Sequence, residues 1–311
     1  MRRIIPLLML LGCLTACAAA PEAPPAGDAP AVNAEAAVPS GDGALSGESV
    51  FSQPAPEDLI YTVELETLTD SAEAEDGTVL IDRSYQLPVM TVKRQDGTPL
   101  TEAAMPAEEA ALAVAETFNN RFRAWVEADS ADEEQIKWAE EDRAFMEESG
   151  QDWLPYTVDL DCSVYQTEEL VSVSAECYRA TPMAAHPNTV LLAWNFDLTT
   201  GQFFTPELLA SDGQAFSQAV TEELLRQSRE TAESYDMAPE VFFWENYRDI
   251  LAGWSSYAVS FDGTGMAVGF SPYELAGYAA GSQIYHLDYS QISGYLSDHG
   301  RAMLGLPAVE K

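Results

Sequence analysis

The spacing of the apolar residues changes along this chain, and the order of those changes limits the folds that it can adopt. Tyr61, Val63 and Leu65 alternate with polar residues, as in a strand with one buried face. From residue 106 the apolar residues recur every three or four positions, as in an amphipathic helix. Later blocks of both kinds follow without a regular strand–helix–strand rhythm. The sequence therefore predicts an α+β fold with antiparallel or mixed sheets and packed helices, rather than a doubly wound parallel sheet.

The same patterns predict individual elements. Strands are expected at residues 59–65, 79–81, 85–92, 156–160, 170–173, 190–196, 257–261, 266–270 and 283–289. Helices are expected at 106–125, 131–149, 216–225 and 292–296, the third of them opened by a cap at Asp212. Turns are expected in the acidic stretch 70–77. On the second helix we expect Ile136, Ala139 and Phe145 to face inward.

The N-terminus has the pattern of an export signal. Arg2 and Arg3 precede an apolar run at residues 4–14, which is shorter than the ~20 residues of a membrane span. The run ends in Leu14-Thr15-Ala16-Cys17, which resembles a bacterial lipobox. We expect residues 1–16 to be removed and Cys17 to carry the lipid of an outward-facing cell-envelope lipoprotein. The alternative is an ordinary signal peptide cut within residues 16–20, which would leave a secreted protein.

A composition change follows the predicted signal. Residues 17–57 are rich in alanine, proline, glycine and serine and hold few large apolar side chains. Such a segment cannot bury enough surface to offset the entropy of ordering it, so we expect a disordered tether. After it we expect two associated α+β modules, at residues 58–155 and 156–300.

The net charge limits the partners. Fifty-one acidic residues against fifteen basic ones give a formal net charge of −36. This balance argues against nucleic acid and anionic lipid headgroups, which bind basic patches. It favours a cationic partner, although acidity also serves simply to keep an exported protein soluble.

Two cysteines remain after Cys17, and an exported protein lies where disulfides form. Cys162 and Cys177 would pair only with help from an irregular turn. If residues 166–169 form the turn of a hairpin, Cys162 faces about Val173 and Cys177 faces about Val158, too far apart for a disulfide. The sequence leaves both a structural disulfide and two free thiols open.

Three segments resemble one known family. Residues 195–202 (Asn-Phe-Asp-Leu-Thr-Thr-Gly-Gln) with Thr205-Pro206-Glu207-Leu208-Leu209 are similar to a segment of the RsiV-like extracytoplasmic domain, a domain of unknown function. Ala184-Ala185-His186-Pro187-Asn188 stands where that family commonly has G-G-A-H-G-N, and residues 270–281 resemble its F-x-P-Y-E block. Residues 58–155 more weakly resemble the PdaC-type module that usually precedes it, notably at residues 87–90 and 118–119.

The resemblance implies recognition rather than a defined reaction. One member type of that family is an anti-sigma factor whose outer domain binds lysozyme, and another carries a peptidoglycan deacetylase domain. This sequence shows neither a sigma-binding segment before its apolar run nor the T-F-D-D-G-P motif of the deacetylase. We therefore expect a recognition module without such an output domain.

No motif in the sequence indicates a particular chemistry. His186, His286 and His299 form no H-E-x-x-H and have no metal-ligand spacing, and no nucleophile elbow or phosphate-binding loop is present. We predict no catalytic residue, no metal and no cofactor. His186, Tyr273 and Glu274 are the candidate binding residues, each with the alternative of a purely structural role. The predicted function is non-enzymatic binding of a cationic, lysozyme-like protein or of wall glycan. The alternative is a peptidoglycan- or glycan-acting hydrolase.

Overall fold

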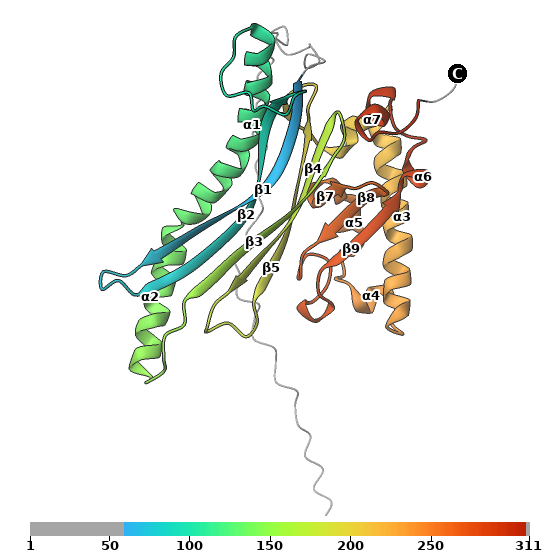
Figure 1. Cartoon of the computed structure of the whole chain (residues 1–311). Coiled ribbons are helices and arrows are strands. Elements are labelled where there is room, and N and C mark those ends of the chain that lie inside the picture. Colours follow the sequence, from blue (N-terminus) through green and yellow to red (C-terminus); the bar gives the residue numbers. More distant parts are fainter. Residues whose placement is uncertain (1–58, 309–311) are drawn as a thin grey trace, which may run out of the picture. The chain divides into compact units, whose positions relative to one another are not determined.

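The computed structural model describes residues 59–308. The predicted signal peptide, Cys17 and the predicted tether lie outside these residues. The described part combines helices with two β-sheets, so the predicted α+β class is confirmed (Figure 1). In this part of the chain no helix has both the length and the apolar character needed to cross a membrane.

The larger sheet has six strands in chain order. They are β1 (Leu59–Glu73), β2 (Val79–Arg94), β3 (Tyr156–Gln166), β4 (Leu170–Ala180), β5 (Asn188–Asp197) and β6 (Gln202–Phe203). Neighbouring strands are antiparallel except β2 and β3, which are parallel. A parallel pair requires a long crossover, and residues 95–155 supply it with two helices.

The β1–β2 hairpin is longer than predicted. The stretch 70–77 was expected to form turns, but β1 continues to Glu73, and Asp70 pairs with Arg83. The expected strands at 79–81 and 85–92 are one strand, β2. The expectation was wrong because β1 lies at the sheet edge, where polar side chains remain in solvent and do not interrupt pairing.

Helices α1 (Pro106–Ser130) and α2 (Glu133–Glu148) pack on one face of this sheet (Figure 1). Phe118 and Phe122 of α1 contact Phe196 and Trp194 of β5, with ring centroids 5.3 and 5.1 Å apart. On α2 the structure buries Ala139 as predicted, whereas Phe145 is exposed.

Met146 takes the inward position expected for Phe145. Residues seven positions apart lie on nearly the same helix face, so Met146 follows Ala139 toward the core, and Phe145 is rotated away by one residue.

The smaller sheet is an antiparallel meander of β7 (Ala258–Phe261), β8 (Gly265–Phe270) and β9 (Gln283–Asp288). It packs against α3 (Gly213–Ser234) on one side and against β4 and β5 on the other (Figure 1). Asp212 caps α3 as predicted, because its Oδ1 accepts from the N–H groups of Gln214 and Ala215.

The short helices are α4 (Pro239–Phe242), α5 (Tyr247–Ala252), α6 (Tyr289–Ile292), α7 (Asp298–Met303) and the 3₁₀ turns η1 (Pro206–Leu209), η2 (Trp254–Ser256) and η3 (Tyr278–Ala280).

The helix expected at residues 292–296 begins earlier in the chain. A capping box between Asp288 and Gln291 starts α6 at Tyr289, directly after β9, and α6 ends at Ile292. Ile292 and Leu296 are both buried, but the residues between them are not helical. The helix expected at 292–296 is therefore wrong after Ile292, where the chain forms a turn.

The predicted boundary between modules, at residues 155 and 156, falls inside the larger sheet. Tyr156 opens β3 and pairs with Ile81 of β2, and one apolar core contains side chains from both sides of the boundary. A second core lies between the small sheet and α3. Ser172 and Asn195 join β4 and β5 to β7, because Ser172 accepts from the N–H of Phe261 and Asn195 donates to the C=O of Val259. The assignment of two family modules stays a prediction.

Candidate functional site

The face of the larger sheet that points away from α1 and α2 is acidic. Alternation along β3 turns Val158, Leu160 and Cys162 toward the helices, so Asp159 and Asp161 lie on the opposite face. The register places Glu176 of β4 directly opposite Asp161. Like charges directly opposite each other on neighbouring strands destabilise a sheet.

The same face continues onto β2. Asp82 is close enough to Asp159 to act on its charge. Burial, followed by the fields of Asp161 and Asp82, raises the pKa of Asp159 above its ordinary value. Ser84, Thr157, Ser163, Ser174 and Tyr178 share this surface with Ala180 of β4 and with Leu191 and Ala193 of β5, and none of these residues is a lysine or arginine. We call Asp82, Asp159, Asp161 and Glu176 the acidic face.

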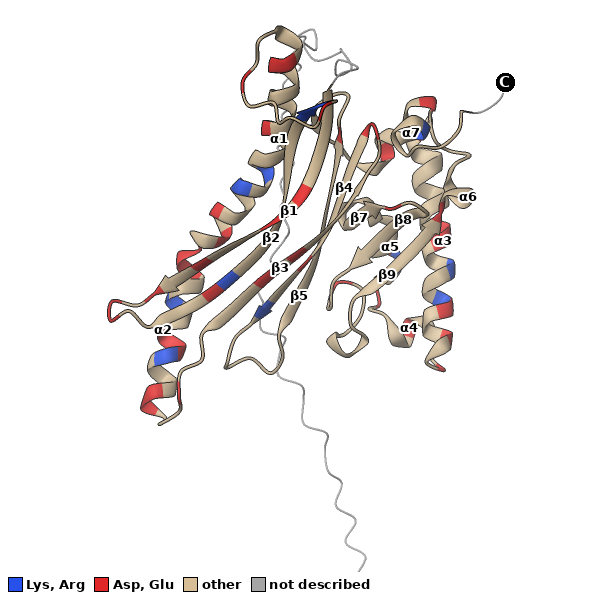
Figure 2. Ribbon diagram, in the orientation of Figure 1, with Lys and Arg blue, Asp and Glu red and all other residues tan. Residues whose placement is uncertain are grey.

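The small sheet borders the acidic face. Leu191 of β5 stands opposite Glu176 in register, and its Cδ1 would lie 2.9 Å from a Cβ placed on Gly269 of β8. The small sheet therefore covers Leu191, and the carboxylates of the acidic face lie beside the small sheet. In Figure 2 acidic segments are spread over strands and helices, and basic segments are few.

The structure brings two of the three predicted binding residues together. His186 Nε2 lies 3.0 Å from the hydroxyl of Tyr273, although 87 residues separate them in sequence. The imidazole also stacks on Tyr278, with centroids 3.5 Å apart and planes 14° from parallel. We call His186, Tyr273 and Tyr278 the aromatic cluster.

Tyr273 has an unusual backbone. Its φ is +72°, in the left-handed region that a bulky side chain rarely adopts, and its side chain is 53% exposed. The indole N–H of Trp244 donates to the C=O of Tyr273 at 2.9 Å, which holds this conformation. Strained residues of this kind concentrate at binding sites.

Glu274, the third predicted binding residue, supports the loop from within. Its Oε2 accepts from the N–H of Ser271 at 2.6 Å, and the Ser271 hydroxyl accepts from the N–H of Leu191. Burial raises the pKa of Glu274, and the bonds from Ser271 oppose that change. The carboxylate therefore ties the loop to β5 instead of joining the aromatic cluster.

Sequence reasoning missed Trp244 and Tyr278 as members of this surface. Tyr278 stands in the same family-like block as Tyr273, so its position in that block was an available signal. Trp244 follows α4, 29 residues before Tyr273, and nothing local to Trp244 indicates that they meet.

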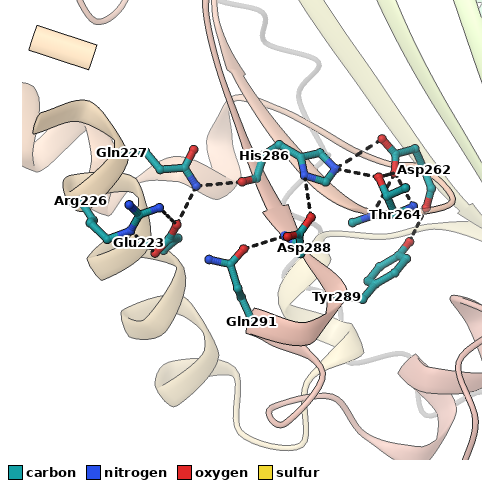
Figure 3. A network of polar contacts seen from close by, with 10 residues as sticks. Glu223, Arg226, Gln227, Asp262, Thr264, His286, Asp288, Tyr289 and Gln291 are labelled. Carbon is teal, nitrogen blue, oxygen red and sulfur yellow. Dashed lines mark hydrogen bonds and ion pairs between the residues drawn. The ribbon is translucent and has the colours of Figure 1, made fainter. Parts of the chain in front are cut away.

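His286 belongs to a separate polar network at the tip of the small sheet (Figure 3). Its Nε2 lies 3.4 Å from Asp262 and 3.2 Å from Thr264, and its Nδ1 lies 3.5 Å from Asp288. Burial alone would raise the pKa of Asp262, but hydrogen bonds from Thr264 and Gly265 more than offset it, so the pKa is lowered.

The third histidine lies elsewhere again. His299 of α7 approaches Asp197 at 3.4 Å and Glu169 at 3.9 Å. The three histidines therefore have different partners. Within residues 59–308 no group of three or more histidine, cysteine, aspartate or glutamate side chains is placed to hold a metal ion.

Cys162 and Cys177 are free and buried in the structure. The hairpin register places Cys162 opposite Ala175 and Cys177 opposite Leu160, so the expected register was wrong by two residues. The turn lies one residue later in the chain than expected, where the Thr167 hydroxyl accepts from the N–H groups of Glu169 and Leu170. The two cysteines are diagonal neighbours, for which ~7–8 Å is typical. Burial raises the pKa of Cys162 to about 12 and also raises that of Cys177.

Comparisons with known proteins give the fold. No protein-family model and no curated protein matches the chain. A crystal structure of a DUF3298-family member from Bacteroides fragilis has a TM-score of 0.50 and 13% identity, and the match covers 79% of this chain and 96% of that one. A DUF3298-family structure from Pseudomonas aeruginosa has a TM-score of 0.43 and 13% identity, over 83% of this chain and all of that one. This chain thus shares its fold with the first of these, a member of a family of domains of unknown function.

Proposed function

We propose that this protein is a non-enzymatic recognition module of the cell envelope that binds a cationic protein, such as a lysozyme-like muramidase, through its acidic face. A lipid on Cys17 would hold it at the outer surface of the membrane. The observation that carries the proposal is the direct opposition of Asp161 and Glu176, with Asp82 and Asp159 beside them.

The electrostatics of the acidic face support a cationic ligand. The charges of Asp161 and Asp82 raise the pKa of Asp159, and Asp161 stands directly opposite the like charge of Glu176. None of the residues that pair with these four carboxylates in the sheet is a lysine or arginine. A lysine or arginine of a partner relieves that repulsion when it binds. The net charge of −36 also attracts cationic proteins from a distance, and salt weakens this attraction.

The aromatic cluster supports wall glycan as a second ligand class. Tyr273 and the neighbouring Trp244 are 53% and 40% exposed. The indole N–H of Trp244 donates to the backbone C=O of Tyr273, and the Tyr273 hydroxyl is hydrogen-bonded to His186, so both rings are held at the surface. Fixed, exposed aromatic rings offer flat apolar area with little loss of conformational entropy on binding. The hydrolase alternative stays a prediction; release of soluble fragments from purified peptidoglycan, lost in His186→Ala, would support it.

The decisive experiment measures binding of hen lysozyme to the purified protein at low and high salt. We expect Asp161→Asn combined with Glu176→Gln to weaken binding about tenfold at low salt, which corresponds to ~1.4 kcal/mol. The matched control is Glu133→Gln combined with Glu134→Gln, which removes two exposed carboxylates at the start of α2. An equal loss in both double variants would show that only net charge matters, and would contradict a localised site.

A further inference from the structure

Among residues 59–308, no strand pairs with the outer edge of β9. β9 pairs with β8 along one side, and on the other side Gln227 of α3 donates to the C=O of His286 at 2.8 Å. The N–H of Asp288 likewise points away from β8, to the side chain of Gln291 (Figure 3). In an antiparallel ladder alternate residues direct both backbone groups to the same side. Ile284, His286 and Asp288 therefore present their N–H and C=O groups outward.

A groove runs between this edge and α3. Residues of α3, β9 and α6 line it, among them Glu223, Arg226, Gln227, Glu230, Ile284 and Asp288. It therefore combines an open strand edge with a helix wall, the arrangement in which extended peptides add to a sheet.

The groove has a negative charge. Three carboxylates (Glu223, Glu230 and Asp288) line it against one guanidinium, that of Arg226. Arg226 is bonded to Glu223 and Glu230 on its own helix, so it is not available as an anion receptor. Its hydrogen bonds to Glu223 are the main reason that the pKa of that carboxyl falls to about 2, and Glu223 remains ionised. A ligand of matching charge is basic.

We infer that the groove between α3 and β9 binds an extended, lysine- or arginine-containing peptide segment of another protein, which adds to β9 as a fourth strand of the small sheet. The side chain of Gln227 is hydrogen-bonded to the C=O of His286 in the absence of the peptide, and the added strand replaces that bond. Charge disfavours the other occupants. A second copy would bring its own Asp288 to the same edge, and the segment 17–57 of this chain contains carboxylates but no lysine or arginine. The inference does not depend on the acidic face.

A labelled peptide tests the inference. The probe is a fluorescein-labelled octapeptide of alternating lysine and valine, titrated into the full chain with anisotropy as the readout. Its controls are two versions of the same peptide, one N-methylated on the odd-numbered amides and the other on the even-numbered amides. N-methylation keeps the charge and removes the N–H donors that pair with β9. We expect at least tenfold weaker binding for the methylated peptides. No binding of the parent peptide, or equal binding of all, would overturn the inference.

Three variants localise the binding. Ile284→Pro removes one outward N–H, a change that edge strands tolerate, and should weaken binding at least tenfold. Its matched control, Ile284→Thr, keeps the N–H and should bind within about twofold of the parent. Gln227→Ala frees the His286 carbonyl and should tighten binding severalfold.

Hydrogen exchange keeps the test valid if Ile284→Pro fails to fold. In the parent protein the peptide should slow exchange of the Ile284 and His286 amides. Unchanged exchange at both amides, with the peptide bound, would contradict strand addition.

Discussion

Asp161 and Glu176 lie directly opposite each other on β3 and β4, with both side chains exposed on the face of the larger sheet that points away from α1 and α2. The pair opposes folding, since like charges in this position destabilise a sheet. Removing one charge while keeping the shape should therefore stabilise the protein. We expect Asp161→Asn to raise the free energy of unfolding by about 0.5 kcal/mol in urea titrations. A decrease would indicate that Asp161 makes a compensating contact.

Asp159 makes the stability of the protein depend on pH. Its folded pKa is raised, so protonation favours the folded state. The stability that this group contributes is present below its unfolded pKa and is lost as pH rises through the raised folded pKa. Asp159→Asn should therefore flatten the decline of stability across that window. Urea unfolding of both proteins at several pH values measures the difference, and parallel curves would refute it.

Tyr273 offers a test of backbone strain. Because its φ is +72°, glycine should be better tolerated there than alanine. Both substitutions remove the ring and its contacts with His186 and Tyr278. We expect Tyr273→Gly to be about 1 kcal/mol more stable than Tyr273→Ala by thermal or urea unfolding. If alanine is the more stable variant, the left-handed conformation is not retained.

Gly300 is required by a close backbone approach. A Cβ at this position of α7 would lie 2.1 Å from the C=O of Leu209. Gly300→Ala should lower the free energy of unfolding by about 1–3 kcal/mol, because the backbone of one segment must move. Gly294→Ala is the matched control, since nothing lies within 4 Å of its Cβ position. Equal effects in the two variants would contradict the close contact.

Ser172 links the two cores. Its hydroxyl is hydrogen-bonded to Asn195 and accepts from the N–H of Phe261. Ser172→Ala leaves buried polar groups without partners and should cost about 1–3 kcal/mol. Ser163→Ala, on the exposed acidic side of β3, should change stability little. Thermal unfolding of the two variants distinguishes these outcomes.

Local patterns predicted most elements of this fold. The three- and four-residue spacing of Leu112 to Phe122 fixes α1, and the alternation of Tyr156, Val158 and Leu160 fixes the buried face of β3. That alternation already places Asp159 and Asp161 on the outer face. Their pairing with Glu176 depends on the turn after Gln166, where the expected register was wrong by two residues.

Contacts between distant segments could not be predicted from local sequence patterns. The residues of the aromatic cluster come from the loop before β5 and from the segment between β8 and β9, and no local periodicity relates His186 to Tyr273. The groove beside β9 arises because α3 packs along a strand that follows it by about fifty residues. Both features depend on how the small sheet packs against β4 and β5.

Carboxyl footprinting tests the central claim most directly. Carbodiimide-driven labelling with glycine ethyl ester, read by mass spectrometry, reports the accessibility of individual carboxylates with and without lysozyme. The account predicts reduced labelling of Asp161 and Glu176 in the complex and unchanged labelling of Glu133 and Glu134. Unchanged labelling at Asp161 and Glu176 in a formed complex, or equal protection at all four positions, would contradict binding at the acidic face.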